Sequence, residues 1–198
     1  MQEWCREWAR VYSPANAAAV VRSIALGIFG MDVLLVVDMQ EASVSENNWH
    51  DVAGVLARIN ALAARVRDRG GCVVFVQHDG SAEEGLVPFT PGWEVARALE
   101  QDPRDRFLRK TLNDPFHGTT LNELLRELKS SRLLISGWAT DFCVDAAVRS
   151  AVARGYDVVV VSDGHTLDDR PHLHASQVIT HHNWVWERLI TNASVRVA

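Results

Sequence analysis

The chain has 198 residues, a formal net charge of −5 at pH 7 and 23% charged residues. A chain of this length can bury the core of one domain. Its acidic balance excludes a broad electrostatic surface for nucleic acid. No apolar run approaches the roughly 18 residues of a membrane-spanning helix. Three cysteines without a Cys-x-x-Cys pair predict neither a disulfide framework nor a structural zinc site, so we expect a cytoplasmic protein.

Residues 1–30 differ in pattern from the rest of the chain. Trp4 and Trp8 can share one face of a short helix, and Pro14 is suited to the first position of a second. We expect residues 1–30 to be a helical appendage outside the native domain, as a misplaced start codon would produce, with the domain at 31–198. The alternative is a genuine helical arm used in packing or assembly. An intact mass of the natively expressed protein that matches residues 1–198 would refute the misplaced start.

Strand and helix patterns alternate from residue 32 onward. Apolar runs predict strands at 32–37, 72–76, 107–110, 133–135, 156–161 and, at the C-terminus, 194–197. Apolar residues at helical spacing predict helices at 49–69, 93–99, 119–129, 141–154 and 171–190. The glycine- and proline-rich segment 80–93 is a long loop, a kind of segment that is usually functional or disordered. Fully apolar strands that alternate with amphipathic helices indicate an α/β fold, with a parallel sheet of five or six strands and helices on both faces.

Several polar residues follow these strands. Right-handed crossovers place the carboxyl ends of all parallel strands at one edge of the sheet, where open α/β sheets bind ligands. We therefore expect a shared crevice lined by the residues at the strand ends, which are Asp38, His78, Lys110, Cys143 and Asp163.

Cys143 is the candidate nucleophile. It falls in the first turn of the helix predicted from Asp141, with Thr140 or Asp141 as the N-cap. Free N–H groups and the helix dipole at that position stabilise a thiolate and lower the thiol pKa. The alternative is that Cys143 is a small apolar residue packed under the sheet, as most free cysteines are.

Asp38 and Lys110 can serve such a nucleophile. Cys143 can attack a carbonyl carbon, and Asp38 can take the thiol proton and return it to the leaving group. Lys110 can hold the carboxylate and stabilise developing negative charge. The backbone N–H groups of Ala139 and Cys143 lie where an oxyanion would form. Alternatively, Asp38 simply caps the following loop and Lys110 is a surface lysine.

The motifs that carry these residues resemble those of the isochorismatase-like cysteine hydrolases. The similar stretches cover about residues 32 to 191, and the matching motifs are at 36–40, 109–110, 116–119, 136–144, 149–151, 155–158 and 162–166. The resemblance implies a three-layer α/β sandwich and an Asp38–Lys110–Cys143 catalytic triad. It also implies a cis peptide between Trp138 and Ala139 that turns the Ala139 and Cys143 N–H groups toward the oxyanion.

The family also bears on metals, cofactors and substrates. Its nicotinamidase branch builds a metal site from an Asp and several His after the second strand. Here only His78 and Asp79 occur there, so we expect no metal and no cofactor. His78 is either a substrate hydrogen-bond partner, which we favour, or an anchor for the loop. We expect Trp138 to border the pocket, with a core-facing indole as the alternative. Three further aromatic residues are candidate pocket residues or plain core: Trp93, Phe116 and Phe142.

The presence of Cys143 favours acyl chemistry over ether hydrolysis. We predict a hydrolase that cleaves a small amide or related C–N bond of a small-molecule substrate through a thioester. One alternative is hydrolysis of a vinyl ether, as in isochorismatases proper, which needs Asp38 but not Cys143. Another is a non-catalytic ligand-binding or assembly module on the same fold. The family usually forms homo-oligomers, and we expect one here.

Overall fold

The computed structural model describes residues 31–46 and 49–198, so the predicted appendage at 1–30 lies outside the described residues. Six strands form one sheet in the order β3-β2-β1-β4-β5-β6, and every neighbouring pair is parallel. The strands are β1 (Asp32–Val37), β2 (Cys72–His78), β3 (Arg106–Lys110), β4 (Arg132–Trp138), β5 (Asp157–Thr166) and β6 (Val195–Val197). The predicted parallel sheet is confirmed, with six strands.

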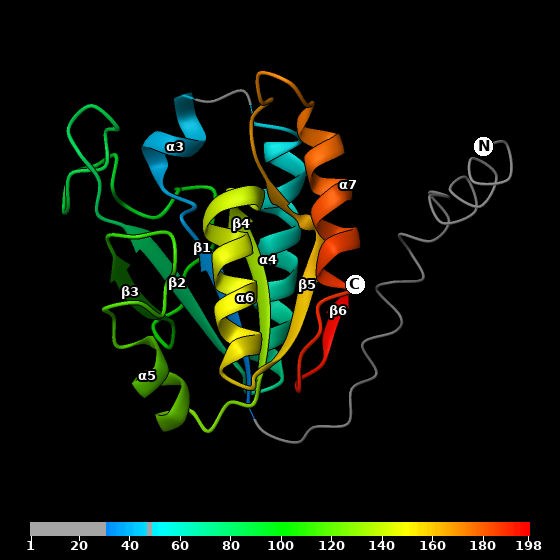
Figure 1. The fold of residues 1–198 in the computed structure, drawn as a ribbon. Helices are drawn as coiled ribbons and strands as arrows, with labels where there is room; N and C mark the ends of the chain where they lie inside the picture. Colours follow the sequence, from blue (N-terminus) through cyan, green and yellow to red (C-terminus); the bar gives the residue numbers. More distant parts are fainter. Residues whose placement is uncertain (1–30, 47–48) are drawn as a thin grey trace, which may run out of the picture.

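Helices cover both faces of this sheet, as predicted (Figure 1). The helical segments are α3 (Glu41–Glu46), α4 (Val52–Asp68), α5 (Leu121–Glu127), the π-helical turn η1 (Thr140–Val144), α6 (Asp145–Ala153) and α7 (Ala175–Trp186). Helix α4 lies on one face, and α5 and α6 lie on the other. The molecule is therefore a three-layer α/β sandwich.

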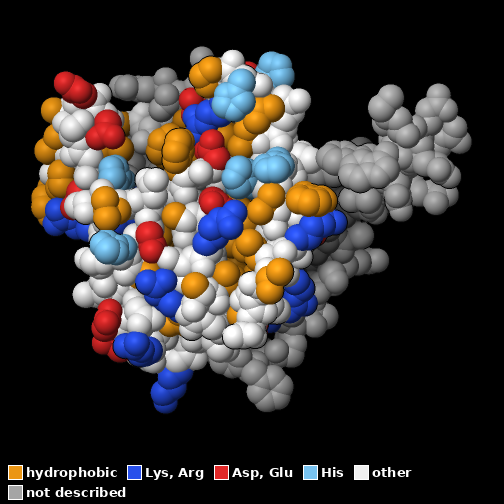
Figure 2. All heavy atoms as spheres, in the orientation of Figure 1, with side chains coloured by type: hydrophobic (Ala, Val, Ile, Leu, Met, Phe, Trp, Pro, Cys, Tyr) orange, Lys and Arg blue, Asp and Glu red, His pale blue; other side chains and the backbone are white. Residues whose placement is uncertain are grey.

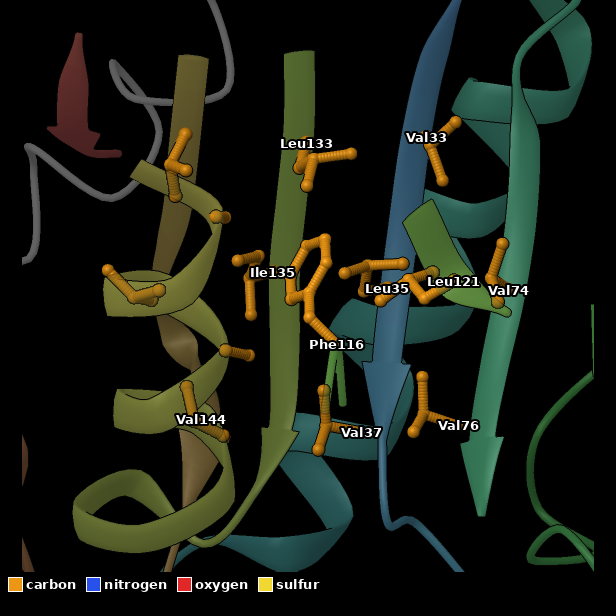
Figure 3. Close-up of a cluster of buried hydrophobic side chains, with 14 of the residues drawn as sticks. Val33, Leu35, Val37, Val74, Val76, Phe116, Leu121, Leu133, Ile135 and Val144 are labelled. Atoms are coloured by element: carbon orange, nitrogen blue, oxygen red, sulfur yellow. The ribbon is translucent and has the colours of Figure 1, made fainter. Parts of the chain in front are cut away.

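The central strand β1 contributes to the cores on both faces. Leu34 and Val36 join the hydrophobic cluster under α4, whereas Val33, Leu35 and Val37 join the cluster under α5 and α6 (Figure 3). All five side chains are almost fully buried, and burial of each contributes about 1.5–3 kcal/mol. Because neither side of β1 meets water, the strand is a continuous apolar run, and its carboxyl end is a rigid base for the residue that follows.

Strand β4 approaches β1 very closely at Gly137. A Cβ atom at this position would lie 2.1 Å from the carbonyl oxygen of Val37, and the backbone φ of Gly137 is +125°. Only glycine meets both requirements. The residues that follow β1 and β4 are therefore held side by side at the carboxyl edge of the sheet.

Segment 93–99 is not helical, and the predicted short helix is wrong. Val95 forms an isolated antiparallel bridge with Gln40. The Ala96 N–H donates to the carbonyl of Met39 at 2.9 Å, and the Gln40 side chain donates to the carbonyl of Trp93 at 2.9 Å. These long-range bonds draw the segment along the chain that follows β1, and so they override its local helical pattern.

The described part of the chain has an ordinary protein surface. No helix within it is both long enough and apolar enough to cross a membrane. Figure 2 shows acidic and basic side chains interspersed over the visible face, with no continuous basic stripe there.

Candidate active site

Asp38 is the first residue after β1. Its φ of +51° lies in the left-handed region, which aspartate tolerates better than most residues. The residue is 2% exposed, so its carboxylate is shielded from bulk water. Burial raises the pKa of this carboxyl group, and the Lys110 charge partly opposes the rise. A buried carboxylate with a raised pKa is suited to accept a proton.

Lys110 ends β3 and joins the other two residues. Its Nζ lies 2.6 Å from Asp38 Oδ2 and donates a hydrogen bond to Cys143 Sγ at 3.3 Å. The Lys110 side chain is fully buried, so the surface-lysine alternative is wrong. Three residues from the ends of three strands thus meet in one small space, as the fold predicts. Because water is excluded, the ammonium charge acts strongly on both neighbours.

Cys143 lies in η1, the π-helical turn that runs directly into α6, so it falls in the first turn of a helical segment, as expected. Single π-helical turns joined to an α-helix are rare and occur often at functional sites. The expected lowering of the thiol pKa is wrong. Burial, followed by the negative charge of Asp38, raises the pKa of Cys143 to about 12, although Lys110 opposes the rise. The resting side chain is therefore a neutral thiol, which needs a base in contact with it before it can act as a nucleophile.

Asn113 contacts the sulfur as well, and the sequence reasoning missed it. The Cys143 thiol donates to Asn113 Oδ1 at 3.6 Å, and the side chain of Asn113 is exposed. It follows Lys110 by three residues in a loop without regular structure. Its short distance in sequence from Lys110 was the one available signal that Asn113 could lie near the site.

We expect Asn113→Asp to lower kcat/KM roughly 10- to 100-fold, or about 1.4–2.8 kcal/mol. A carboxylate in place of the amide oxygen would raise the thiol pKa further and disfavour its ionisation. Steady-state kinetics on an active amide measure this effect, and Asn113→Ala is the matched control with a smaller loss. Wild-type kinetics for Asn113→Asp would contradict the contact.

His78 is the last residue of β2. Its electrostatic interaction with Asp38 is the smallest of the causes that lower the pKa of that carboxyl group. The backbone N–H and carbonyl of His78 bond the Gln40 side chain at 2.8 and 3.0 Å. The backbone therefore anchors the loop, while the imidazole does not. The ring atom Nδ1 is buried and has no partner among the described residues. The role of His78 as a substrate hydrogen-bond partner stays a prediction.

Asp79 is held by two side chains, one from β3 and one from the loop that follows Asp79. Arg109 binds its carboxylate through Nε and Nη2 at 2.7–3.1 Å, and Trp93 Nε1 donates to it at 2.9 Å. Within residues 31–46 and 49–198, no group of three or more His, Cys, Asp or Glu side chains is arranged to hold a metal ion. The residues here do not fit the metal site of the nicotinamidase branch.

Two predicted pocket residues pack against hydrophobic clusters. Trp138 stacks on Trp49 with ring centroids 5.0 Å apart and packs against the cluster under α4, whereas Cys143 belongs to the cluster on the other face. Phe116 is 6% exposed and packs beside Ile135 in the cluster under α5 and α6 (Figure 3). The packing therefore favours core roles for Trp138 and Phe116.

The other two aromatic candidates lie on loops and turns at this edge. Trp93 is 6% exposed, and Phe89 packs on its ring with centroids 5.2 Å apart, so it braces the loop. Phe142 precedes the nucleophile and is 52% exposed, with the Arg170 guanidinium 5.2 Å from its ring centre. Of the two, Phe142 is the better candidate for contact with a substrate.

The backbone before η1 has the predicted conformation. The peptide between Trp138 and Ala139 is cis, as the resemblance implies. The use of the Ala139 and Cys143 N–H groups as oxyanion donors stays a prediction.

The fold and this cluster define a class of protein, a three-layer α/β protein with a buried Cys–Asp–Lys site at the carboxyl edge of its sheet. The isochorismatase domain family matches residues 32–188. The chain belongs to that family.

Comparisons with individual proteins agree with this family assignment. The chain is 38% identical over 157 residues to a streptothricin hydrolase of Streptomyces noursei, a match that covers 78% of this chain and 62% of that protein. It is 28% identical to a ureidoacrylate amidohydrolase of Variovorax paradoxus, with 76% of this chain and 75% of that protein covered. A crystal structure of an isochorismatase family protein superimposes with a TM-score of 0.76 at 30% identity, covering 84% and 97% of the two chains. The chain thus spans less than two thirds of the streptothricin hydrolase.

Proposed function

We propose that this protein is a cysteine hydrolase that cleaves a small amide or related C–N bond. The observation that carries the proposal is the position of Lys110 Nζ, 2.6 Å from Asp38 Oδ2 and 3.3 Å from Cys143 Sγ, in a buried site. Two relatives with hydrolase names, one a streptothricin hydrolase and the other an amidohydrolase, support the reaction class.

Acylation begins with the neutral thiol. Asp38 takes the thiol proton while the sulfur attacks the carbonyl carbon, and the carbonyl π electrons move to oxygen. Lys110 stabilises the negative charge that passes through the site, and the Ala139 and Cys143 N–H groups bind the oxyanion. When the oxyanion collapses, the C–N bond breaks, and Asp38 returns the proton to the departing amine.

Deacylation repeats these roles with water. Asp38 takes a proton from a water molecule, whose oxygen attacks the thioester carbon. The C–S bond then breaks, and the proton on Asp38 returns to the sulfur. The enzyme is regenerated with a neutral thiol, which is the resting form that the raised pKa of Cys143 favours.

A panel of small primary amides, ureido acids and isochorismate tests the proposal. Released ammonia or amine and the acid product are quantified for the wild-type protein. We expect turnover of at least one amide or ureido compound and none of isochorismate. Turnover of isochorismate alone would favour vinyl-ether hydrolysis. Absence of turnover together with saturable binding of a panel compound would favour the ligand-binding module.

A further inference from the structure

A buried polar cluster lies behind the turn that carries Cys143. It consists of Thr140, the first residue of η1, His165 on β5 and Asn183 on α7, and each is at least nine-tenths buried. Thr140 Oγ1 lies 2.9 Å from His165 Nδ1, and His165 Nε2 lies 3.0 Å from Asn183 Oδ1. The cluster links three elements that are distant in sequence, and none of the roles given to Asp38, Lys110 and Cys143 uses it.

The hydrogen-bond partners fix the protons in this cluster. Asn183 Nδ2 donates to the carbonyl of Ser162 at 2.9 Å, so Asn183 Oδ1 faces the imidazole as an acceptor. His165 Nε2 must therefore carry a hydrogen. Burial lowers the pKa of His165 to about 4, so the ring is neutral at neutral pH and Nδ1 is an acceptor. The Thr140 hydroxyl then donates to Nδ1, with the carbonyl of Thr166 as a second, longer acceptor at 3.2 Å.

Helix α7 also holds the other end of the turn. Trp186, one helical turn after Asn183, donates from Nε1 to Asp145 Oδ1 at 2.8 Å, and Asp145 is the first residue of α6. The His165 and Trp186 rings are in edge contact, with centroids 5.1 Å apart. Thus α7 reaches Thr140 through His165 and reaches Asp145 directly. Cys143 lies between these two anchored residues.

We propose that His165, Asn183 and Trp186 are positioning residues that hold the turn of Cys143 in register with Lys110 and Asp38. The inference rests on the proposed function. Such π-helical turns are uncommon, and the side-chain contacts of Thr140 and Asp145 hold η1 at its first residue and directly after its last. Small displacements of a nucleophile from its base lower the rate steeply. The hydroxyl of Thr140 and the indole N–H of Trp186 therefore affect catalysis without touching the substrate.

The test compares Thr140→Val, which removes only the hydroxyl, with Thr140→Ser, which keeps it. Thr166→Val is a matched control, because the Thr166 hydroxyl is equally buried but donates to the carbonyl of His50 at 2.6 Å, whereas Thr140 contacts only the Thr166 carbonyl, which the substitution keeps. We expect Thr140→Val to lower kcat roughly 10- to 100-fold with KM within about twofold of wild type. Thr140→Ser and Thr166→Val should stay within about threefold.

A second readout does not depend on turnover. Iodoacetamide alkylation of Cys143 at pH 9, followed by peptide mass mapping, should become at least about fivefold faster in Thr140→Val, since a loosened turn admits water to the thiol. Trp186→Phe keeps the aromatic ring, loses the N–H and should change both readouts in the same direction, so it serves if Thr140→Val does not fold. Wild-type kcat and wild-type alkylation in a folded Thr140→Val or Trp186→Phe protein would overturn the inference. If Cys143→Ala retains turnover, the proposed function fails, and the alkylation rates alone decide the positioning role.

Discussion

Cys143→Ala is expected to lower kcat/KM for amide substrates by more than about 10³-fold, because no other group in the cluster can form the thioester. The Asp38–Lys110 pair remains in this variant. The substitution removes one sulfur from a buried position, so the fold should persist, which circular dichroism and thermal melting can verify.

Cys143→Ser is the matched companion, and a comparable loss is expected because a hydroxyl ionises far less readily than a thiol. Retained amide turnover in Cys143→Ala would rule out the acyl-enzyme. Turnover of isochorismate by both the wild-type protein and Cys143→Ala would instead identify ether hydrolysis, which needs Asp38 but not Cys143.

Asp38→Asn should lower the catalytic rate and raise the rate at which Cys143 is alkylated. Loss of the base should lower kcat/KM about 10²–10⁴-fold. At the same time the pKa of Cys143 should fall from about 12 toward its ordinary value, since the Asp38 charge is the second largest cause of its rise. Each unit of decrease raises the thiolate fraction about tenfold. Alkylation of Cys143 by iodoacetamide at pH 9 should therefore be faster in the inactive variant.

Asp163→Asn is the control for this experiment. Asp163 is an exposed carboxylate on β5 whose Oδ2 lies 3.4 Å from Arg58 Nε, so neither readout should change. Slower alkylation in Asp38→Asn, or full activity, would contradict the role given to Asp38.

The sheet and the convergence of the three residues could be predicted from the sequence, because both depend on local patterns. Apolar runs mark the strands, and parallel topology brings the residues after β1, β3 and β4 to one edge. The protonation state of Cys143 could not be predicted. It depends on burial and on the distance to Asp38, and the sequence gives neither quantity.

Three further features could not be predicted from the sequence, for physical reasons. Trp138 is the last residue of β4, where the sequence alone does not say which face of the sheet its side chain occupies, and its stacking on Trp49 places it on the α4 side. Segment 93–99 has a helical pattern but is drawn into long-range bonds with the residues after β1. Asn113 lies in a loop, where spacing alone does not predict direction. The expected cytoplasmic location and homo-oligomeric state stay predictions.

The central claim is that substrates pass through a common thioester on Cys143. Partitioning with hydroxylamine tests it most directly, using two active amides that share an acyl group but differ in the leaving amine. We expect the same ratio of hydroxamate to acid from both substrates, because both products would arise from one acyl-enzyme. A ratio that depends on the leaving amine would contradict it.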